Sequence, residues 1–166
     1  MHQYRNATAQ DLPIIVSIYN STIASRMVTA DLDEVSVESK KHWFDGHKPD
    51  TRPLWMVEDA AGEIVGWVSF SSFYGRPAYN ATVEISIYLA EQQRGKGSGK
   101  AILEHCIDRA PAMGIKTILG YIFGHNTPSL RLFYNLGFTD WAVLPNIAEL
   151  DGVERSLIIV GKRIVR

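Results

Sequence analysis

YLAEQQRGKGSGKAIL, residues 88–103, joins two apolar runs through three closely spaced glycines. The run before the glycines alternates like a strand, and the run after them has helical spacing, so the glycines are expected to form the turn into a helix. The first N–H groups of a helix lack partners, and the helix dipole adds roughly half a positive charge there. The stretch therefore predicts an anion-binding loop.

Three phosphate-binding patterns can be compared with this loop. A P-loop is excluded because Ala101 stands where serine or threonine is required, and the G-x-G-x-x-G dinucleotide pattern fails because its third glycine is missing. The pattern that fits is R-x-x-G-x-G, formed by Arg94, Gly97 and Gly99. Without further context, the loop could equally be a simple glycine-rich connection between a strand and a helix.

Composition narrows the class of protein. The 17 basic and 18 acidic residues balance, so we expect neither a nucleic-acid partner nor an anionic membrane partner. The single cysteine, Cys106, excludes a disulfide framework, and the histidines show no ligand spacing, so no metal is expected. No signal peptide or transmembrane run is found. We expect one cytoplasmic domain over residues 1–166.

Hydrophobic periodicity predicts the order βααβββαβαββ, a mixed α/β (α+β) sheet with helices on both faces. Thr8 and Asp11 form a variant capping box, and a second, polar helix is expected over 37–48. The final strands are expected at 138–144 and 156–163. In the strand at 81–90, one face carries Val83, Ile85, Ile87 and Leu89, and the other carries Thr82, Glu84, Ser86 and Tyr88.

Three parts of the chain together resemble the GNAT superfamily of N-acetyltransferases. They are the R-x-x-G-x-G loop, NTPSLRLFYNLGF at 126–138, and the strand–loop–helix–strand–helix order between 82 and 137. Within that superfamily, RP at 76–77, TVEISIYL at 82–89 and RGKGSG at 94–99 most resemble the phosphinothricin and methionine sulfoximine acetyltransferases. The resemblance implies a mostly antiparallel sheet that splays between the strands at 82–90 and 116–123. It also implies acetyl-CoA as cosubstrate and a homodimer.

The resemblance implies a set of residues that bind acetyl-CoA. Amides of the glycine loop would take the pyrophosphate, and the exposed edge of the strand before the loop would pair with the pantetheine arm. The implied set is Ile87, Tyr88, Leu89, Arg94, Gly95, Lys96, Gly97, Ser98, Gly99, Lys100, Asn126 and Ser129.

Glu84 is the candidate general base, acting directly or through a water. Burial beside aromatic side chains would raise the pKa of its carboxyl group toward the working range. The alternative is a solvated polar residue on an alternating strand. The implied acceptor-binding residues are Arg76, Pro77, Ala78, Glu84, Ile85 and Ser86. Arg76 could pair with a carboxylate or phosphinate, or could be an ordinary surface arginine.

Other parts of the site follow from analogy or residue type. Aromatic walls are expected from Trp55, Trp67, Phe73 and Tyr74, and a lid from Arg26 and Met27. Many members of the superfamily place a general-acid tyrosine where this chain has Phe133. Its neighbour Tyr134 is turned about 100° around the helix. The thiolate could therefore leave without a protein acid.

These features predict an N-acetyltransferase that moves acetyl from acetyl-CoA to the α-amino group of a small amino acid or analogue. Attack would be direct, in a ternary complex. Two alternatives remain. One keeps the enzyme but changes the acceptor to a polyamine, an aminoglycoside or a protein N-terminus, although the near-neutral charge argues against a polycation. The other is a non-catalytic acyl-CoA sensor, which would not need Glu84.

Overall fold

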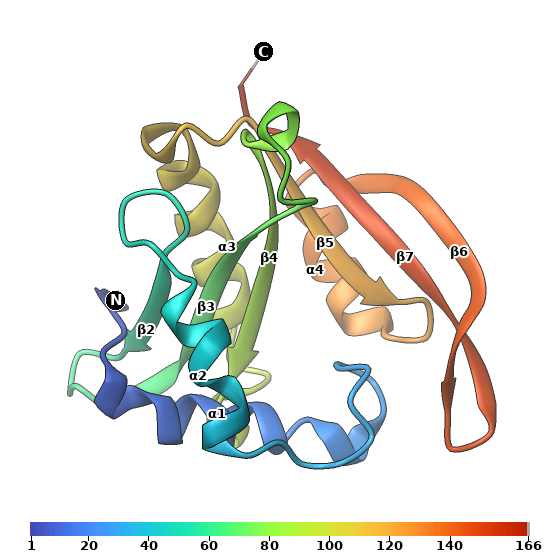
Figure 1. The fold of residues 1–166 in the computed structure, drawn as a ribbon, viewed down its shortest axis with the longest axis horizontal. Helices are drawn as coiled ribbons and strands as arrows, with labels where there is room; N and C mark the ends of the chain where they lie inside the picture. Colours follow the sequence, from blue (N-terminus) through green and yellow to red (C-terminus); the bar gives the residue numbers. More distant parts are fainter. Residues whose placement is uncertain (166) are drawn as a thin grey trace.

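Within residues 1–165, the sheet at the centre of the fold has seven strands in the order β1-β2-β3-β4-β5-β7-β6. The computed structural model describes residues 1–165 and is shown in Figure 1. The strands are β1 (Gln3–Asn6), β2 (Leu54–Glu58), β3 (Ile64–Ser72), β4 (Thr82–Leu89), β5 (Thr117–Phe123), β6 (Thr139–Leu150) and β7 (Val153–Arg163). The α-helices are α1 (Leu12–Asn20), α2 (Val37–Asp45), α3 (Ser98–Arg109) and α4 (Thr127–Asn135). The predicted order βααβββαβαββ is confirmed.

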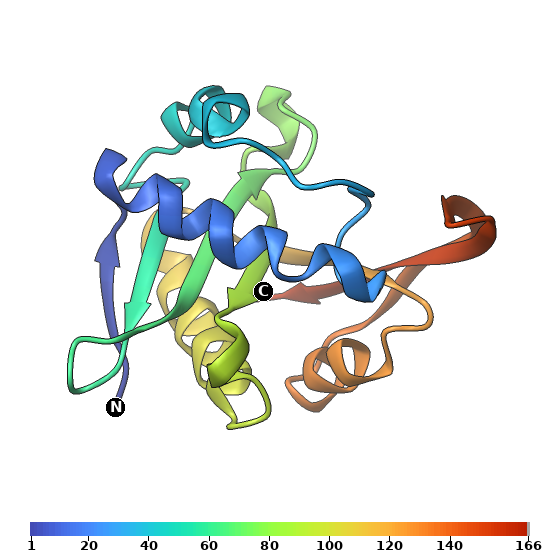
Figure 2. The ribbon, with the colours of Figure 1, turned by 90° about the horizontal axis from the view of Figure 1, so that it is seen from below.

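The helices cover both faces of the sheet, as Figure 2 shows, with α1 and α2 on one side and α3 and α4 on the other. The larger apolar cluster lies on the α3–α4 side and includes Val83, Ile102 and Phe133. A smaller cluster beneath α1 includes Met56 and Trp67. Burial of apolar surface on both faces fixes the sheet as the middle layer.

Among the strands found in residues 1–165, β4 and β5 form the only parallel pair, and the pairing is short. Thr82–Glu84 align with Thr117–Leu119, and beyond that point the two strands diverge (Figure 1). All other neighbouring strands are antiparallel. The predicted mostly antiparallel sheet, splayed between these two strands, is therefore confirmed.

The alternation predicted for β4 is also confirmed. Val83 and Ile85 are buried on the α3–α4 side. On the opposite face, Glu84, Ser86 and Tyr88 border a pocket beneath α1 and α2. Because side chains of a strand alternate, these three residues share one face of β4 and reach the same pocket.

Three boundaries differ in detail from the sequence prediction. The Thr8–Asp11 capping box is present, but it opens a 3-10 turn (Ala9–Asp11) that leads into α1. Helix α2 ends at Asp45 rather than near residue 48. Strands β6 and β7 are longer than predicted because their pairing continues past an irregularity between Leu144 and Ala148. The irregularity contains Pro145 and Asn146, and Asn146 has a positive φ. Because proline interrupts strand pairing, the sequence predicted that the strand ends before it.

Candidate active site

The glycine loop leads from β4 into the N-terminus of α3. Gly95 and Gly97 have φ values of +73° and +82°, a conformation that side chains rarely adopt. Gly97 is the N-cap residue, so the helix begins at Ser98 with first-turn amides that have no partner within the helix. The predicted anion-binding geometry is therefore present.

Arg94 ties the glycine loop back to the rest of the fold. Its guanidinium donates to the carbonyl of Leu89 at 3.2 and 3.3 Å and to the hydroxyl of Ser21 at 2.8 Å. These contacts join the loop to the end of β4 and to the residue that follows α1. The arginine of the R-x-x-G-x-G pattern thus positions the loop through its own hydrogen bonds.

Strand β4 presents an open backbone edge to the splay. Ala90 donates to the carbonyl of Val65 at 2.9 Å, and Phe73 donates to the carbonyl of Thr82 at 3.4 Å. Antiparallel pairing alternates, so these two bonds place the backbone groups of the even-numbered residues 82–88 against β3. Ile85 and Ile87 therefore direct their N–H and C=O groups toward β5, where strand pairing stops at Glu84. The backbone of Tyr88 faces β3, so only its side chain is available for a ligand.

The splay opens into a cavity of about 160 Å³, called here the β4–β5 cleft. Six of the residues predicted to bind acetyl-CoA line it: Ile87, Tyr88, Leu89, Gly99, Asn126 and Ser129. Asn126 caps α4 by accepting from the N–H of Ser129 at 3.3 Å, and it donates to the carbonyl of Met27 at 3.0 Å. Its amide group is thus held on both sides and fixes one wall of the cleft.

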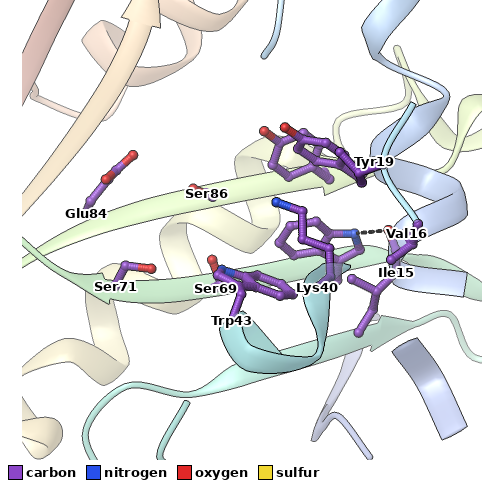
Figure 3. A pocket seen from close by; sticks show the side chains of 12 residues that line it. Ile15, Val16, Tyr19, Lys40, Trp43, Ser69, Ser71, Glu84 and Ser86 are labelled. Atoms are coloured by element: carbon purple, nitrogen blue, oxygen red, sulfur yellow. Dashed lines mark hydrogen bonds between the residues drawn. The ribbon is translucent and has the colours of Figure 1, made fainter. Parts of the chain in front are cut away.

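A second cavity of about 210 Å³, the α1–α2 pocket, lies on the other face of the sheet (Figure 3). Its floor consists of three cross-strand pairs, Trp67–Tyr88, Ser69–Ser86 and Ser71–Glu84. Its walls come from α1 and α2 and the segment between them: Ile15, Val16, Tyr19, Val35, Lys40 and Trp43. The indole N–H of Trp67 donates to the carbonyl of Ile15 at 3.1 Å, which fixes the aromatic end of the floor.

Glu84 lies at the other end of that floor. Its carboxylate makes no hydrogen bond or ion pair with any residue in the range 1–165, and burial raises its pKa above the usual value. Glu84 also borders a third cavity of about 410 Å³, beside Thr29, Tyr121 and Ile147. A half-buried carboxylate with a raised pKa and access to two cavities is suited to accept a proton.

Ser86 and Tyr88 connect the three cavities, because each lines all of them. The phenol of Tyr88 has a raised pKa, mainly through burial. Its ring lies 5.2 Å from that of Tyr19, whose hydroxyl bonds the side chains of Thr29 and Asp31. Burial raises the pKa of Tyr19 to about 12, so both phenols are neutral. Strand β4 therefore separates a cleft with an open backbone edge from a pocket with a polar floor.

The model of the family described as Acetyltransferase (GNAT) family matches residues 16–138. The chain belongs to this acetyltransferase family. A relative from Bacillus subtilis (strain 168), provisionally named a phosphinothricin acetyltransferase, is 50% identical over 160 residues, 96% of this chain and 98% of the relative. An L-methionine sulfoximine/L-methionine sulfone acetyltransferase from Pseudomonas paraeruginosa (strain DSM 24068 / PA7) is 32% identical over 148 residues, 89% and 86% of the two chains.

A solved structure extends the comparison to a bound ligand. The GNAT superfamily phosphinothricin acetyltransferase from Sinorhizobium meliloti, solved in complex with AcCoA, superimposes with a TM-score of 0.89 at 28% identity. The match covers 98% of this acetyltransferase and 88% of that chain. The family predicted from the loop and from residues 126–138 is therefore confirmed.

The rest of the predicted acetyl-CoA set lies around the glycine loop of this acetyltransferase. Gly95, Lys96, Ser98 and Lys100 adjoin Gly99, which lines the β4–β5 cleft. Lys100 is exposed and lies 3.9 Å from Glu104, one helical turn further on. A weak pairing of this kind leaves the lysine available to an anion.

The structure divides the predicted acceptor-binding residues. Glu84 and Ser86 line the α1–α2 pocket, whereas the side chain of Ile85 faces the core and the β4–β5 cleft. Arg76, Pro77 and Ala78 are exposed in the loop before β4 and do not line this pocket. Their predicted contact with an acceptor stays a prediction.

The predicted aromatic walls are only partly correct. Trp67 lines the α1–α2 pocket, but Trp55 packs on the opposite face of the sheet against Phe70. Phe73 and Tyr74 pack with Tyr79 in the loop after β3 and lie outside the pocket lining. Neighbouring strands pack their side chains by register, which periodicity within one strand does not reveal.

Sequence reasoning assigned none of the six wall residues to a site, and the polar or aromatic ones among them are Tyr19, Lys40 and Trp43. Lys40 and Trp43 are three residues apart on α2, so they share a face of that helix. This spacing could have indicated an inward face, but the sequence does not specify which strand residues that face covers.

The structure also shows where the predicted lid residue Arg26 lies and where Phe133 and Tyr134, at and beside the usual general-acid position, lie. Arg26 pairs with Asp151 in the β6–β7 turn at 2.7 Å, and its carbonyl bonds His125 at 2.8 Å. Phe133 lines the β4–β5 cleft, and Gly120 lets its ring approach β5, because a Cβ on Gly120 would lie 2.8 Å from that ring. The hydroxyl of Tyr134 points away and bonds Asp140 at 2.6 Å.

Other sites can be described briefly. In residues 1–165, no group of three or more His, Cys, Asp or Glu residues could hold a metal ion. Over the same range, no helix has the length and apolar character needed to cross a membrane. Cys106 is fully buried in the core beneath α3, and burial raises the pKa of its thiol.

Proposed function

We propose that this acetyltransferase transfers acetyl from acetyl-CoA to the α-amino group of a small amino acid or analogue of the phosphinothricin, methionine sulfoximine or methionine sulfone type. The observation that carries the proposal is the position of Glu84. Its half-buried, unpartnered carboxylate faces the α1–α2 pocket, and the strand that carries it, β4, presents its open backbone edge to the β4–β5 cleft. The names of the relatives support the acceptor class.

The β4–β5 cleft fits the donor. Amides of Gly95–Lys100 would take the pyrophosphate, and the open edge at Ile87 and Leu89 would pair with the amides of the pantetheine arm. Asn126 and Ser129 would border that arm on the α4 side. Acetyl-CoA supplies the activated thioester when bound, and the parallel alignment of β4 with β5 ends just where room for it is needed.

Glu84 would take the proton from the acceptor's amino group, directly or through a water. An amine is nucleophilic only when deprotonated. The raised pKa of Glu84 makes its carboxylate a stronger base and narrows the difference from the pKa of the acceptor's ammonium group. Ser86 and Tyr88 would hold the acceptor at the boundary between the α1–α2 pocket and the cleft, where nitrogen can reach the thioester carbon. The new C–N bond forms as the C–S bond breaks, in a ternary complex.

The leaving thiolate would receive no proton from α4. Phe133 has no hydroxyl, and the hydroxyl of Tyr134 is engaged with Asp140. Water or the ammonium product would then protonate coenzyme A. This differs from superfamily members with a tyrosine at the position of Phe133.

The test is release of free thiol from acetyl-CoA with phosphinothricin, methionine sulfoximine and methionine sulfone, beside spermidine, an aminoglycoside and a peptide amine. We expect turnover of the amino-acid analogues, reduced about 10²- to 10⁴-fold in Glu84→Gln, the usual range for a general base. Unchanged rates in Glu84→Gln would remove Glu84 as base. Preferred turnover of spermidine, the aminoglycoside or the peptide would reassign the acceptor. Binding of acetyl-CoA without turnover of any amine would favour the sensor.

We further propose a homodimer that associates through the β6–β7 hairpin. Strand β6 is an edge strand, and the hairpin exposes Trp141, Val143, Ile147 and Val153. An exposed apolar edge strand is prone to pair with another chain. The cytoplasmic location expected from the sequence is likewise a proposal, and cell fractionation checks it.

A further inference from the structure

Two adjacent lysines on α2 differ in their surroundings. Lys41 is exposed and pairs with Glu38 at 2.6 Å on the outer face of the helix. Lys40 lines the α1–α2 pocket, where its ammonium lies 5.2 Å from the centre of the Tyr19 ring. Lys40 makes no ion pair with any residue in the described range 1–165. One lysine therefore serves the helix surface, and the other holds an unpaired charge inside the pocket.

The pocket has opposite charges in different places. Among its lining residues in the described range, Lys40 is the only cation and Glu84 the only anion. Figure 3 shows the two side chains well apart, with Glu84 beside Ser71 and Lys40 near Tyr19. Since they are not paired with each other, each charge is available to a ligand that carries the complementary group.

The floor between these charges is polar. The hydroxyls of Ser69, Ser71 and Ser86 make no hydrogen bond with another residue in the range 1–165, and all three residues line the pocket. Hydroxyl groups that line a cavity and have no protein partner can bond water or a ligand. Together with the two charged side chains, they form a surface suited to a small polar molecule.

We propose that Lys40 binds the α-carboxylate of the acceptor and that the pocket selects zwitterionic amino acids. The acceptor's carboxylate lies on the Lys40 side of the pocket, and its amino group lies on the Glu84 side, where a water can link it to the carboxylate of Glu84. A zwitterion carries one charge of each sign, so it complements the cation and the anion of the pocket. The inference rests on the proposed function and adds the group that recognises the acceptor. Arg76, the cation predicted from the sequence, lies outside the pocket lining.

The test compares methionine sulfone with its α-carboxamide, because the α-carboxylate is the only anionic group of the sulfone. We expect Lys40→Gln to lower kcat/KM for the sulfone about 10- to 100-fold, the loss of one charge-assisted hydrogen bond, mainly through KM. The carboxamide should lose less than about 3-fold, since a neutral amide gains little from a cation. Lys40→Arg, which keeps the charge, should retain the preference for the acid.

The matched control is Lys41→Gln, one residue away on the outer face of α2, which should leave the ratio between acid and carboxamide unchanged. If the carboxamide turns over too slowly, its inhibition constant against the sulfone replaces kcat/KM. Equal losses for both compounds in Lys40→Gln would overturn the inference and leave Lys40 a packing partner of Tyr19. A charge-selective loss in Arg76→Gln instead would move carboxylate recognition to the loop. Absence of turnover in the unsubstituted enzyme would refute the proposed function itself.

Discussion

A single carboxylate defines the chemistry of the site and weakens the fold that holds it. Glu84 is half-buried and has no hydrogen-bond partner among residues 1–165, and its partial burial raises its pKa from 4.5. Between pH 4.5 and the raised pKa, the folded chain therefore binds more protons than the unfolded chain at this position. The free energy of unfolding must fall as the pH rises through that window.

Replacing Glu84 by Gln removes this pH-dependent loss. We expect Glu84→Gln to be more stable than the unsubstituted protein at pH 7, with a smaller gain at pH 4, where both states are largely protonated. Urea denaturation at the two pH values measures the difference. Glu63→Gln, at an exposed position before β3, is the control and should shift neither curve. A gain of equal size at both pH values would contradict the explanation.

Gly97 carries a backbone constraint at the anion loop. Its φ of +82° is nearly that of Gly62, at +83°, in the turn between β2 and β3, and an added Cβ would meet nothing within 4 Å at either position. We expect Gly97→Ala and Gly62→Ala each to cost about 1–2 kcal/mol of stability, the cost of left-handed backbone for an L-residue. Only Gly97→Ala should also weaken acetyl-CoA binding. Calorimetric titration and denaturation test the pair, and equal affinities would remove the loop from the proposed donor site.

At the scale of elements, Asn126 joins α4 to the segment after α1. One amide group caps the helix and holds the carbonyl of Met27, while being only 8% exposed. The wall of the β4–β5 cleft and the segment at residues 26–32 are thus positioned together.

We expect Asn126→Ala to cost about 2 kcal/mol, the upper end of the range for a lost N-cap, because a buried bond to another segment is lost as well. Acetyl-CoA binding should weaken with it. Ser36→Ala is the matched control. Ser36 caps α2 through the N–H of Ser39 at 3.1 Å, and its loss should cost about 1 kcal/mol without affecting acetyl-CoA. Equal effects of the two variants on stability and binding would show that Asn126 acts only as a cap.

At the scale of the whole molecule, the β6–β7 hairpin extends from the edge of the sheet (Figure 1). If it forms the proposed dimer interface, Val143→Arg should shift sedimentation from dimer to monomer, because a charge would replace an apolar contact. Ile14→Arg, at an exposed apolar position on α1, is the control and should leave the dimer intact. A monomer for the unsubstituted protein at assay concentrations would refute the proposal.

The sequence was sufficient for much of this architecture because the relevant signals are local. Alternation within β4 assigned Glu84 and Ser86 to one face, and the glycine spacing located the start of α3. Contacts between different elements could be predicted less well from the sequence. Lys40 reaches Tyr19 only because α2 packs beside α1, and Trp55 faces the opposite layer because of its register with β3. Arg94, which is predicted to bind acetyl-CoA, also bonds Leu89 and Ser21, and the sequence does not indicate these contacts.

Amino-acid substitutions in β4 affect the β4–β5 cleft and the α1–α2 pocket to different extents. The edge that faces the β4–β5 cleft consists of main-chain N–H and C=O groups, which every residue except proline provides. The floor of the α1–α2 pocket consists of side chains, each of which can be exchanged singly. Proteins that descend from such a chain can therefore keep the binding of the proposed acetyl donor almost unchanged while their specificity for the acceptor amine diverges. Positions 84, 86 and 88, with their partners 71, 69 and 67, are where selection for a new amine would act first.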